Sequence, residues 1–303
     1  MDDSTEGIMK VGFIGVGHMG GPMCRNIIKK SGHEVIVYDL NADAVKACTD
    51  LGASAGASVA EMASEVDVIM TSLPMPKDVE AVACGQGGII EGAREGLAYF
   101  DLSTNSPLMV RSISERLASK GVRMLDAPVS GGVVGAEKGT IAIMVGGEKA
   151  LFDEHLALFE SFGANVIHVG DLGAGMVAKI VNNMIAFCNM AAGAEGMMLG
   201  TVAGIDPQVL NQVVRNSSGN SMGFRAVAKK SIEQDWAPSF ALDLAYKDMH
   251  LALELADELA VPLQLSPQVH NLMRMAKGLG YGQDDTVALT RVYQDTLRRN
   301  ISS

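Results

Sequence analysis

The sequence predicts an α/β protein: an N-terminal Rossmann domain with a doubly wound sheet, followed by an all-helical C-terminal domain. Short β-branched runs alternate with amphipathic helical stretches through the first half of the chain, as in parallel strands joined by helices. An expected strand runs directly into a glycine-rich turn at 15–20. After residue 170 only long helical stretches follow.

The first half contains the expected strands, at 10–14, 34–38, 68–73, 98–102, 123–125, 141–145 and 165–169. The continuous apolar run Val68-Ile69-Met70 suits a strand buried on both faces of a parallel sheet. Helix boundaries lie between the strands. Ser58-Val59-Ala60-Glu61 forms a capping box, Ser106-Pro107 is an N-cap before a first-turn proline, and Gly121 ends that helix.

The second half contains the expected helices, at about 174–203, 207–216, 240–259, 262–279 and 284–299. The predicted domains are 9–170 and 171–303, linked by the long helix at about 174–203. Because that helix is uniformly apolar, we expect it to be buried on every side. In proteins of this organisation, ligands bind at the carboxyl ends of the strands and between domains.

Composition excludes several classes of partner. The chain has 303 residues, 48% of them hydrophobic, with a formal charge of −11 and a pI of about 5.0. The sequence has no Lys/Arg run, so nucleic acid and anionic membranes are not expected partners. No uninterrupted apolar stretch reaches the length of about 18 residues that a transmembrane helix needs, so none is expected. An anionic substrate would be held by a few local groups.

Cysteine and histidine spacing predicts neither disulfides nor a metal site. The histidines have no HxxxH or HxH spacing. The cysteines are scattered without a CxxC pair and are expected to be reduced, at positions Cys24, Cys48, Cys84 and Cys188. The acidic stretch 1–6 is unlike a signal or transit peptide, so we expect a cytoplasmic protein.

The glycine-rich turn predicts a dinucleotide site. Gly15-Val16-Gly17-His18-Met19-Gly20 is a GxGxxG motif between a strand and a helix. Gly15 permits the tight turn, Gly17 lets a pyrophosphate approach the backbone, and Gly20 allows close helix–strand packing. Asp39 ends the second strand, without an arginine after it. Its carboxylate would accept ribose hydroxyls and repel a 2′-phosphate, which favours NAD over NADP. FAD and a purely structural glycine turn are the alternatives.

Lys179 and Asn183 are the candidate catalytic pair. They are four residues apart in an apolar stretch that follows Gly170-Asp171-Leu172-Gly173-Ala174-Gly175, so one helical face presents both. A buried lysine is costly unless it has partners, and its pKa shifts readily, which suits proton transfer. A solvated lysine beside a capping asparagine is the alternative interpretation.

Ordered motifs over nearly the whole chain resemble the β-hydroxyacid dehydrogenase family, the 3-hydroxyisobutyrate dehydrogenase-like proteins. Phe13-Ile14 with the GxGxxG motif resembles the family's cofactor motif, and Asp126-Ala127-Pro128-Val129-Ser130-Gly131-Gly132 its substrate motif. The Gly170–Asn183 segment resembles its catalytic motif, and Lys247-Asp248 its later cofactor-side motif. Ser217-Ser218-Gly219 is most similar to the segment in 3-hydroxyisobutyrate and 2-(hydroxymethyl)glutarate dehydrogenases.

The resemblance implies a Rossmann enzyme that oxidises a small β-hydroxy acid with NAD. Lys179 would be the general acid/base on the substrate hydroxyl, and Asn183 would hold the substrate in a reactive pose. Ser130, Gly131 and Gly132 would bind the substrate carboxylate through backbone N–H groups and a hydroxyl. An ordinary Gly-Gly turn is the alternative for that loop.

The same resemblance implies further cofactor contacts and an assembly. The expected cofactor residues outside the glycine motif are Leu73, Pro74, Asp78, Thr104 and Lys247. In relatives the long helix contributes to dimer formation, so a homodimer or homotetramer is expected. Asn105 stands where the family more often has an apolar residue, and its effect on the polarity of the pocket, and so on the exact substrate, stays open.

Two other functions remain open at this point. The first is a semialdehyde, glyoxylate or sulfolactaldehyde reductase, whose relatives commonly prefer NADPH. The second is a non-catalytic dinucleotide-binding module. Such modules tend to have lost the catalytic lysine, so the presence of Lys179 favours an enzyme.

Overall fold

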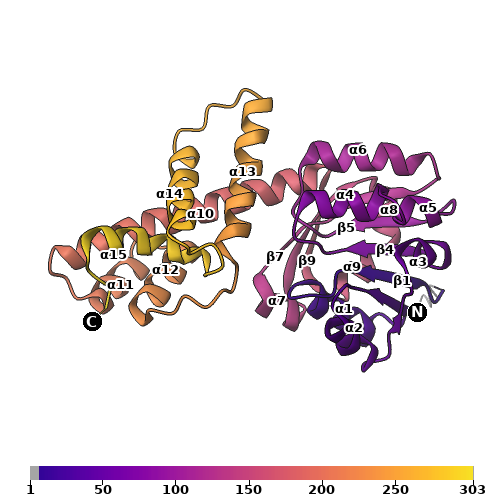
Figure 1. Ribbon diagram of the computed structural model, residues 1–303, viewed down its shortest axis with the longest axis horizontal. Coiled ribbons are helices and arrows are strands. Elements are labelled where there is room, and N and C mark those ends of the chain that lie inside the picture. Colours follow the sequence, from indigo (N-terminus) through magenta and orange to yellow (C-terminus); the bar gives the residue numbers. More distant parts are fainter. Residues whose placement is uncertain (1–6, 303) are drawn as a thin grey trace. The chain divides into compact units, whose positions relative to one another are not determined.

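The computed structural model describes residues 7–302 and divides into two compact units. The acidic stretch at 1–6 lies outside the described residues. The units meet between Lys179 and Ile180, within the long helix α10 (Ala174–Val202). The chain therefore combines a Rossmann-like α/β unit with an all-helical unit, which confirms the predicted fold class (Figure 1).

One sheet forms the centre of the N-terminal unit. Within residues 7–302 it has nine strands, in the order β3-β2-β1-β4-β5-β6-β8-β7, with β9 paired to β8. The strands are β1 (Lys10–Ile14), β2 (Glu34–Tyr38), β3 (Ser54–Ala55), β4 (Val68–Thr71), β5 (Ala98–Asp101), β6 (Arg123–Asp126), β7 (Val129–Ser130), β8 (Ile141–Gly147) and β9 (Gly163–Gly170). All seven expected strands are present, and the two-residue strands β3 and β7 were missed. From β1, the chain adds β2 and β3 on one side of the sheet and then crosses over to add β4, β5 and β6 on the other side. Doubly wound sheets bind ligands at this switch point between β1 and β4.

The sheet is mixed, with a parallel part and an antiparallel part. Strands β3 to β6 are parallel to one another, but β8 pairs antiparallel with both β6 and β7. The reason is the short hairpin-like return from β7 through α7 (Gly132–Lys138) into β8, since parallel strands would need a longer crossover.

Apolar residues alternate along the strands and build a core on each face of the sheet. Phe100 belongs to the same buried cluster as residues of α1 (Gly20–Lys30), whereas its neighbour Tyr99 belongs to the cluster that contains residues of α4 (Pro76–Cys84), which is the period-2 pattern of a strand. Helices cover both faces (Figure 1). The others in this unit are α2 (Ala42–Thr49), α3 (Val59–Glu65), α5 (Ile89–Gly92), α6 (Pro107–Ala118), α8 (Lys149–Glu154) and α9 (Leu156–Glu160).

The predicted helix boundaries have different local causes. The Ser58 hydroxyl accepts the N–H of Glu61 at 3.2 Å, as a capping box requires. Ser106 occupies the N-cap position of α6 and Pro107 follows it, as predicted, but the Ser106 side chain makes no capping hydrogen bond. The N–H of Ser106 instead bonds the Asn105 side chain at 2.7 Å. Gly121 has φ +71°, which suits glycine after a helix.

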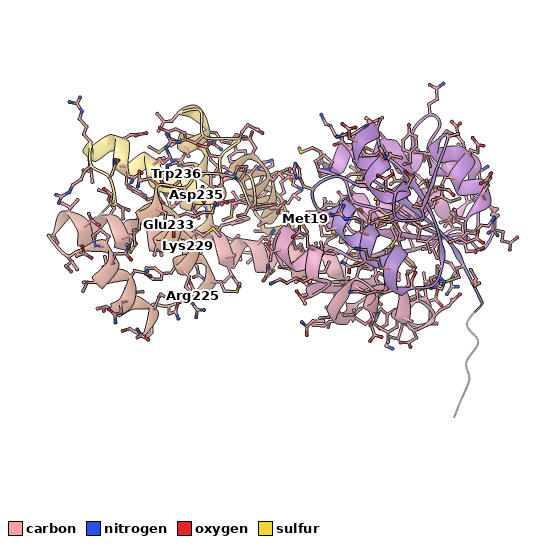
Figure 2. All side chains as sticks on the ribbon, turned by 90° about the horizontal axis from the view of Figure 1, so that it is seen from below. Met19, Arg225, Lys229, Glu233, Asp235 and Trp236 are labelled. Carbon is pink, nitrogen blue, oxygen red and sulfur yellow. The ribbon has the colours of Figure 1, made fainter. Side chains whose placement is uncertain are left out.

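The C-terminal unit is all helical. Its further elements are α11 (Pro207–Arg215), α12 (Met222–Glu233), α13 (Leu242–Glu258), α14 (Ser266–Gly278), a 3₁₀ turn (Thr286–Thr290) and α15 (Arg291–Leu297). Their buried side chains pack with α10 residues such as Phe187 and Met197. Helix α12 was missed, although its charged face recurs every four residues at Arg225, Lys229 and Glu233 (Figure 2). The single helix expected at 284–299 is broken by the buried 3₁₀ turn.

Helix α10 exposes more apolar surface than expected. Val181, Ile185, Leu199 and Val202 are each at least 42% exposed, so burial on every side was wrong for the single chain. By length and composition α10 could cross a membrane, and 39% of its most apolar stretch is buried within the described chain. Core helices of soluble proteins meet the same criterion. Lys179 and Asn183 lie within α10, and polar side chains are expensive in lipid.

Candidate functional site

The glycine loop ends β1 and is tied to the end of β2. Gly15 has φ +87°, and its N–H donates to the Tyr38 carbonyl at 2.9 Å. A Cβ at Gly15 would lie 2.4 Å from the Ser72 carbonyl oxygen, and a Cβ at Gly20 would lie 1.8 Å from that of Gly15. Backbone conformation and packing therefore require both glycines.

Gly17 has a different reason to be glycine. A Cβ there would meet no atom of the described chain within 4 Å, and its φ lies outside the left-handed range. The protein's own packing thus does not need glycine at this position, but a pyrophosphate approaching the backbone would. His18 is exposed beside it, and Met19 is the N-cap residue that precedes α1 in the N-terminal unit (Figure 2). These residues fit a bound dinucleotide.

Asp39 is held against the glycine loop by two backbone bonds. Its Oδ2 accepts the N–H of Val16 at 2.8 Å, and its Oδ1 accepts the N–H of Asn41 at 2.8 Å. Each carboxylate oxygen has another lone pair with which to accept a ribose hydroxyl. The next residue, Leu40, is 94% exposed. The uncharged Leu40 side chain has no positive charge and no hydrogen-bond donor for a 2′-phosphate, which is consistent with NAD.

The loops that follow β4 and β5 are joined to each other. The Ser103 hydroxyl accepts the N–H of Leu73 at 2.9 Å, which ties the Leu73-Pro74 loop to the Ser103-Thr104 loop. Both loops lie at the carboxyl ends of neighbouring parallel strands. Asp78 lies in the first turn of α4, where a carboxylate favours the helix N-terminus whether or not a ligand is present.

Asn105 belongs to a buried polar network in the N-terminal unit. It is 0% exposed, and its Nδ2 donates to the buried carboxylate of Asp101 at 3.3 Å. Asp101 also accepts the Thr71 hydroxyl and the N–H of Ser103. The amide therefore completes this buried polar network below the loop.

The Ser130-Gly131-Gly132 loop has a backbone that only glycine adopts easily. Ser130 ends β7, Gly131 has φ +138° and Gly132 has φ +66°. A Cβ at Gly132 would meet no described atom within 4 Å, so its backbone has open space beside it. Consecutive N–H groups in such a turn can converge on a carboxylate.

Lys179 and Asn183 both lie on α10, one turn apart, with exposed fractions of 9% and 7%. Lys179 is the last residue of the N-terminal unit, which also contains the glycine loop and Ser130. Asn183 belongs to the C-terminal unit, where its Nδ2 donates to Oδ2 of Asp248 at 2.6 Å. Both side chains are thus buried polar groups on a mostly apolar helix.

Asp248 was missed as a candidate site residue. It is 1% exposed on α13, and the Lys247 Nζ lies 3.1 Å from its Oδ1. An amide and an ammonium thus compensate its buried charge. The sequence pattern indicates that Asp248 faces the interior, because Ala245 and Ala252 lie three and four residues from it on the same helix and are buried.

Asp126, the first residue of the substrate-like motif, is the second missed residue. It is 0% exposed, and its carboxylate accepts the N–H groups of Gly173 and Met176, each at 2.7 Å. Burial raises the pKa of this carboxyl to about 6, although the two N–H bonds act in the opposite direction.

Within residues 7–302, no group of three or more His, Cys, Asp and Glu side chains is arranged to hold a metal ion. The four cysteines are free thiols, and Cys24, Cys48 and Cys84 are buried.

Two family models together match almost the whole chain. Residues 10–170 match the NAD-binding domain of 6-phosphogluconate dehydrogenase, and residues 173–293 match the NAD-binding model of NADP-dependent 3-hydroxyisobutyrate dehydrogenase. Among curated proteins, the chain is 38% identical to 2-(hydroxymethyl)glutarate dehydrogenase of Eubacterium barkeri, over 98% of this chain and 99% of that protein. The chain belongs to the β-hydroxyacid dehydrogenase family.

Other members support this assignment. The chain is 36% identical to 3-hydroxyisobutyrate dehydrogenase of Pseudomonas aeruginosa, over 88% of this chain and 91% of that protein. It is 33% identical to the NAD-dependent L-serine dehydrogenase of the same organism, over 95% and 98% of the two chains. A crystal structure of 3-hydroxyisobutyrate dehydrogenase from Salmonella typhimurium has a TM-score of 0.85 and 32% identity, over 94% and 99% of the chains.

These relationships confirm the predicted family and the enzyme class. The protein is an NAD(P)-dependent hydroxyacid dehydrogenase with an NAD-binding domain. The non-catalytic alternative and the flavin alternative are therefore set aside.

Proposed function

We propose that this dehydrogenase uses NAD to oxidise a small β-hydroxy acid, similar to 3-hydroxyisobutyrate, to its semialdehyde or keto acid, and that the reaction is reversible. One observation carries the proposal. Lys179 and Asn183 are buried one turn apart on α10, with exposed fractions of 9% and 7%. Burying two polar side chains on an apolar helix is costly, and proton transfer at a substrate hydroxyl gives a reason to keep them.

In this proposal Lys179 is the general acid/base. During oxidation its neutral amine accepts the proton of the substrate hydroxyl at Nζ, and in the reverse direction the ammonium returns it. NAD, when bound, accepts the hydride that leaves the hydroxyl carbon. Asn183 orients the substrate, and its own side chain is held by Asp248 at 2.6 Å.

The substrate carboxylate would bind the Ser130-Gly131-Gly132 loop. The Ser130 hydroxyl and the backbone N–H groups of the two glycines are its proposed donors. Positive φ angles of +138° and +66° at Gly131 and Gly132 support an anion-binding turn. Because the chain carries a net charge of −11, such local donors would have to select the carboxylate.

The remaining proposed cofactor contacts lie around the glycine loop and beyond it. Val16, His18 and Met19 belong to the loop itself, and Asp39 would bind the adenine ribose, which favours NAD over NADP. Further contacts are proposed for Leu73, Pro74, Asp78, Thr104 and Lys247. We also propose that the enzyme acts in the cytoplasm as a homodimer or homotetramer.

The test is a substrate screen with NAD and with NADP. The panel contains 3-hydroxyisobutyrate, 2-(hydroxymethyl)glutarate, serine, glycerate, 4-hydroxybutyrate and dihydroxypropanesulfonate. We expect turnover of at least one compound, with NAD preferred. A clear preference for NADPH with a semialdehyde would instead favour the reductase alternative.

The lysine assignment has its own test. Lys179→Ala is expected to lower kcat by about 10²- to 10⁴-fold, while NAD binding, followed by fluorescence titration, persists. Lys120→Ala is the matched control, because Lys120 is an exposed lysine after α6. Normal turnover by Lys179→Ala would refute the assignment.

A further inference from the structure

The first turn of α10 is held by a carboxylate from a distant part of the N-terminal unit. Asp126 ends β6, and its Oδ1 accepts the N–H of Gly173 while its Oδ2 accepts that of Met176, both at 2.7 Å. The first N–H groups of a helix have no partner within the helix. Asp126 therefore caps α10 from another element, 47 residues before Gly173.

Glycines let this helix end approach the sheet. A Cβ at Gly175 would lie 2.4 Å from the Met144 carbonyl oxygen and 2.8 Å from Oδ2 of Asp126. A Cβ at Gly146 would lie 2.4 Å from Oδ1 of Asp126 and 2.7 Å from the N atom of Gly175. The first turn of α10 thus rests directly on β6 and β8, and a side chain at either glycine would push it away.

The contact determines where Lys179 is placed. Met176 is three residues before Lys179, and residues three apart lie on neighbouring turns of one helical face. A helix whose first turn is bonded at two amides can neither rotate nor slide without breaking both bonds. Both bonds are buried and one partner is an anion, which makes them stronger than neutral hydrogen bonds.

We propose that Asp126 is a positioning residue, which fixes the first turn of α10 and thereby the place and the electrostatic environment of the Lys179 amine. This inference rests on the proposed role of Lys179. It assigns a role to the aspartate at the start of the substrate-like motif, which lies on the sheet side of the helix.

The charge of Asp126 also acts on the amine. The N-terminus of α10 has a partial positive charge, which disfavours an ammonium nearby, and an ionised Asp126 offsets it. Ionisable groups at this helix end include Asp101, the register partner of Asp126 on β5, and Asp171 in the turn before α10. Arg111 is a cation there, and its Nε donates to the Leu172 carbonyl at 3.3 Å. Burial raises the pKa of Asp101 as well. Neutralising Asp126 should therefore make Lys179 lose its proton more easily.

The test is Asp126→Asn, compared with Asp206→Asn. Asp206 caps α11 in the same way, by accepting the N–H groups of Gln208 and Val209 at 2.9 and 3.1 Å. For Asp126→Asn we expect kcat to fall about tenfold or more, with the KM for NAD within about twofold of the wild-type value. For NAD-dependent oxidation, kcat rises with pH as the Lys179 amine loses its proton, and this rising limb should move by about half a pH unit toward acid. Asp206→Asn should leave both quantities unchanged.

The outcomes separate this inference from the proposed function. If Lys179→Ala keeps normal turnover, the proposed role of Lys179 fails, and this inference fails with it, whatever Asp126→Asn does. If Lys179→Ala is inactive but Asp126→Asn keeps both its kcat and its pH limb, the positioning role alone is refuted. If Asp126→Asn lowers kcat but does not shift the kcat–pH profile, the proposed effect of the Asp126 charge on the Lys179 amine is refuted.

A measurement on the wild-type enzyme keeps the inference testable if Asp126→Asn does not fold. Hydrogen exchange of the Gly173 and Met176 amides is expected to be slow at pH 7.5, because both N–H groups bond a buried carboxylate. Exchange at the rate of a solvent-exposed amide would refute the contact itself.

Discussion

The carboxylate of Asp248 accepts a hydrogen bond from the side-chain amide of Asn183 at 2.6 Å. Both residues are nearly inaccessible, and they are 65 positions apart in the sequence. The Lys247 ammonium lies 3.1 Å from the other carboxylate oxygen. Asp248 therefore links the proposed substrate-orienting residue on α10 to the proposed cofactor-side lysine on α13.

Replacing Asp248 by asparagine should impair turnover more than cofactor binding. Asparagine keeps the shape but removes the charge, so the link between Asn183 and Lys247 weakens. We expect kcat to fall about tenfold or more, which steady-state kinetics will show. The control is Asp243→Asn on the same helix. The Asp243 side chain is 36% exposed in an ion pair with Lys277, so its loss should change kcat little. Equal effects of the two substitutions would argue against the role of Asp248.

Cofactor preference should change when the end of β2 is altered. Asp39→Asn with Leu40→Arg removes the carboxylate that repels a 2′-phosphate and adds a guanidinium at a position that is 94% exposed. We expect the ratio of kcat/KM for NAD to that for NADP to fall by about 10²-fold, which corresponds to roughly 2.7 kcal/mol. Leu108→Arg, on the exposed surface of α6, is the control. An unchanged ratio in the double variant would mean that Asp39 does not read the ribose.

Local signals predicted most of the fold and part of the site. Each of these signals lies within a few residues of sequence: the GxGxxG motif, the strand end at Asp39, and the spacing of Lys179 and Asn183. Their elements appear where the sequence places them. The glycine motif is informative because each of its glycines has a separate steric or ligand-related reason.

Long-range partners could not be predicted in the same way. Asp126 bonds Met176 across 50 residues, and Asn183 bonds Asp248 across 65. Periodicity can show that Asp248 faces the interior, but it cannot identify its partner, because tertiary packing brings the two helices together. The antiparallel pairing of β8 was missed for a related reason, since the two-residue strand β7 is too short to show a strand pattern.

His270 should make the enzyme less stable in mild acid. It is 5% exposed and stacks on Tyr246 with ring centroids 4.2 Å apart. Burial, helped by the positive charge of Arg274, His250 and Lys277, lowers its pKa to about 4 from the ordinary histidine value of about 6.5. Between these two values the unfolded chain binds a proton that the folded chain does not. The contribution of His270 to stability is therefore present above about pH 6.5 and is lost as the pH falls toward 4.

Melting temperatures between pH 7.5 and 4.5 will check this dependence. His270→Gln keeps a polar side chain that does not titrate. As the pH is lowered, the melting temperature of this variant should therefore fall less steeply than that of the wild type. Asp126 acts in the opposite direction, because its pKa is raised to about 6. For that reason only the difference between the two proteins is informative. Parallel curves would mean that His270 does not contribute to the acid sensitivity.

The exposed apolar face of α10 predicts self-association. Val181, Ile185, Leu199 and Val202 are between 42% and 73% exposed on one helix, and apolar surface of this kind on a soluble protein usually has a partner. We expect light scattering to give a mass of two or four times 31.8 kDa. Leu199→Glu with Val202→Glu should lower that mass, because a charge buried at an interface is costly. Leu108→Glu, which places a charge on the exposed surface of α6 in the other unit, should not. A wild-type mass near 31.8 kDa would show that the chain is a monomer and that its apolar face has another role.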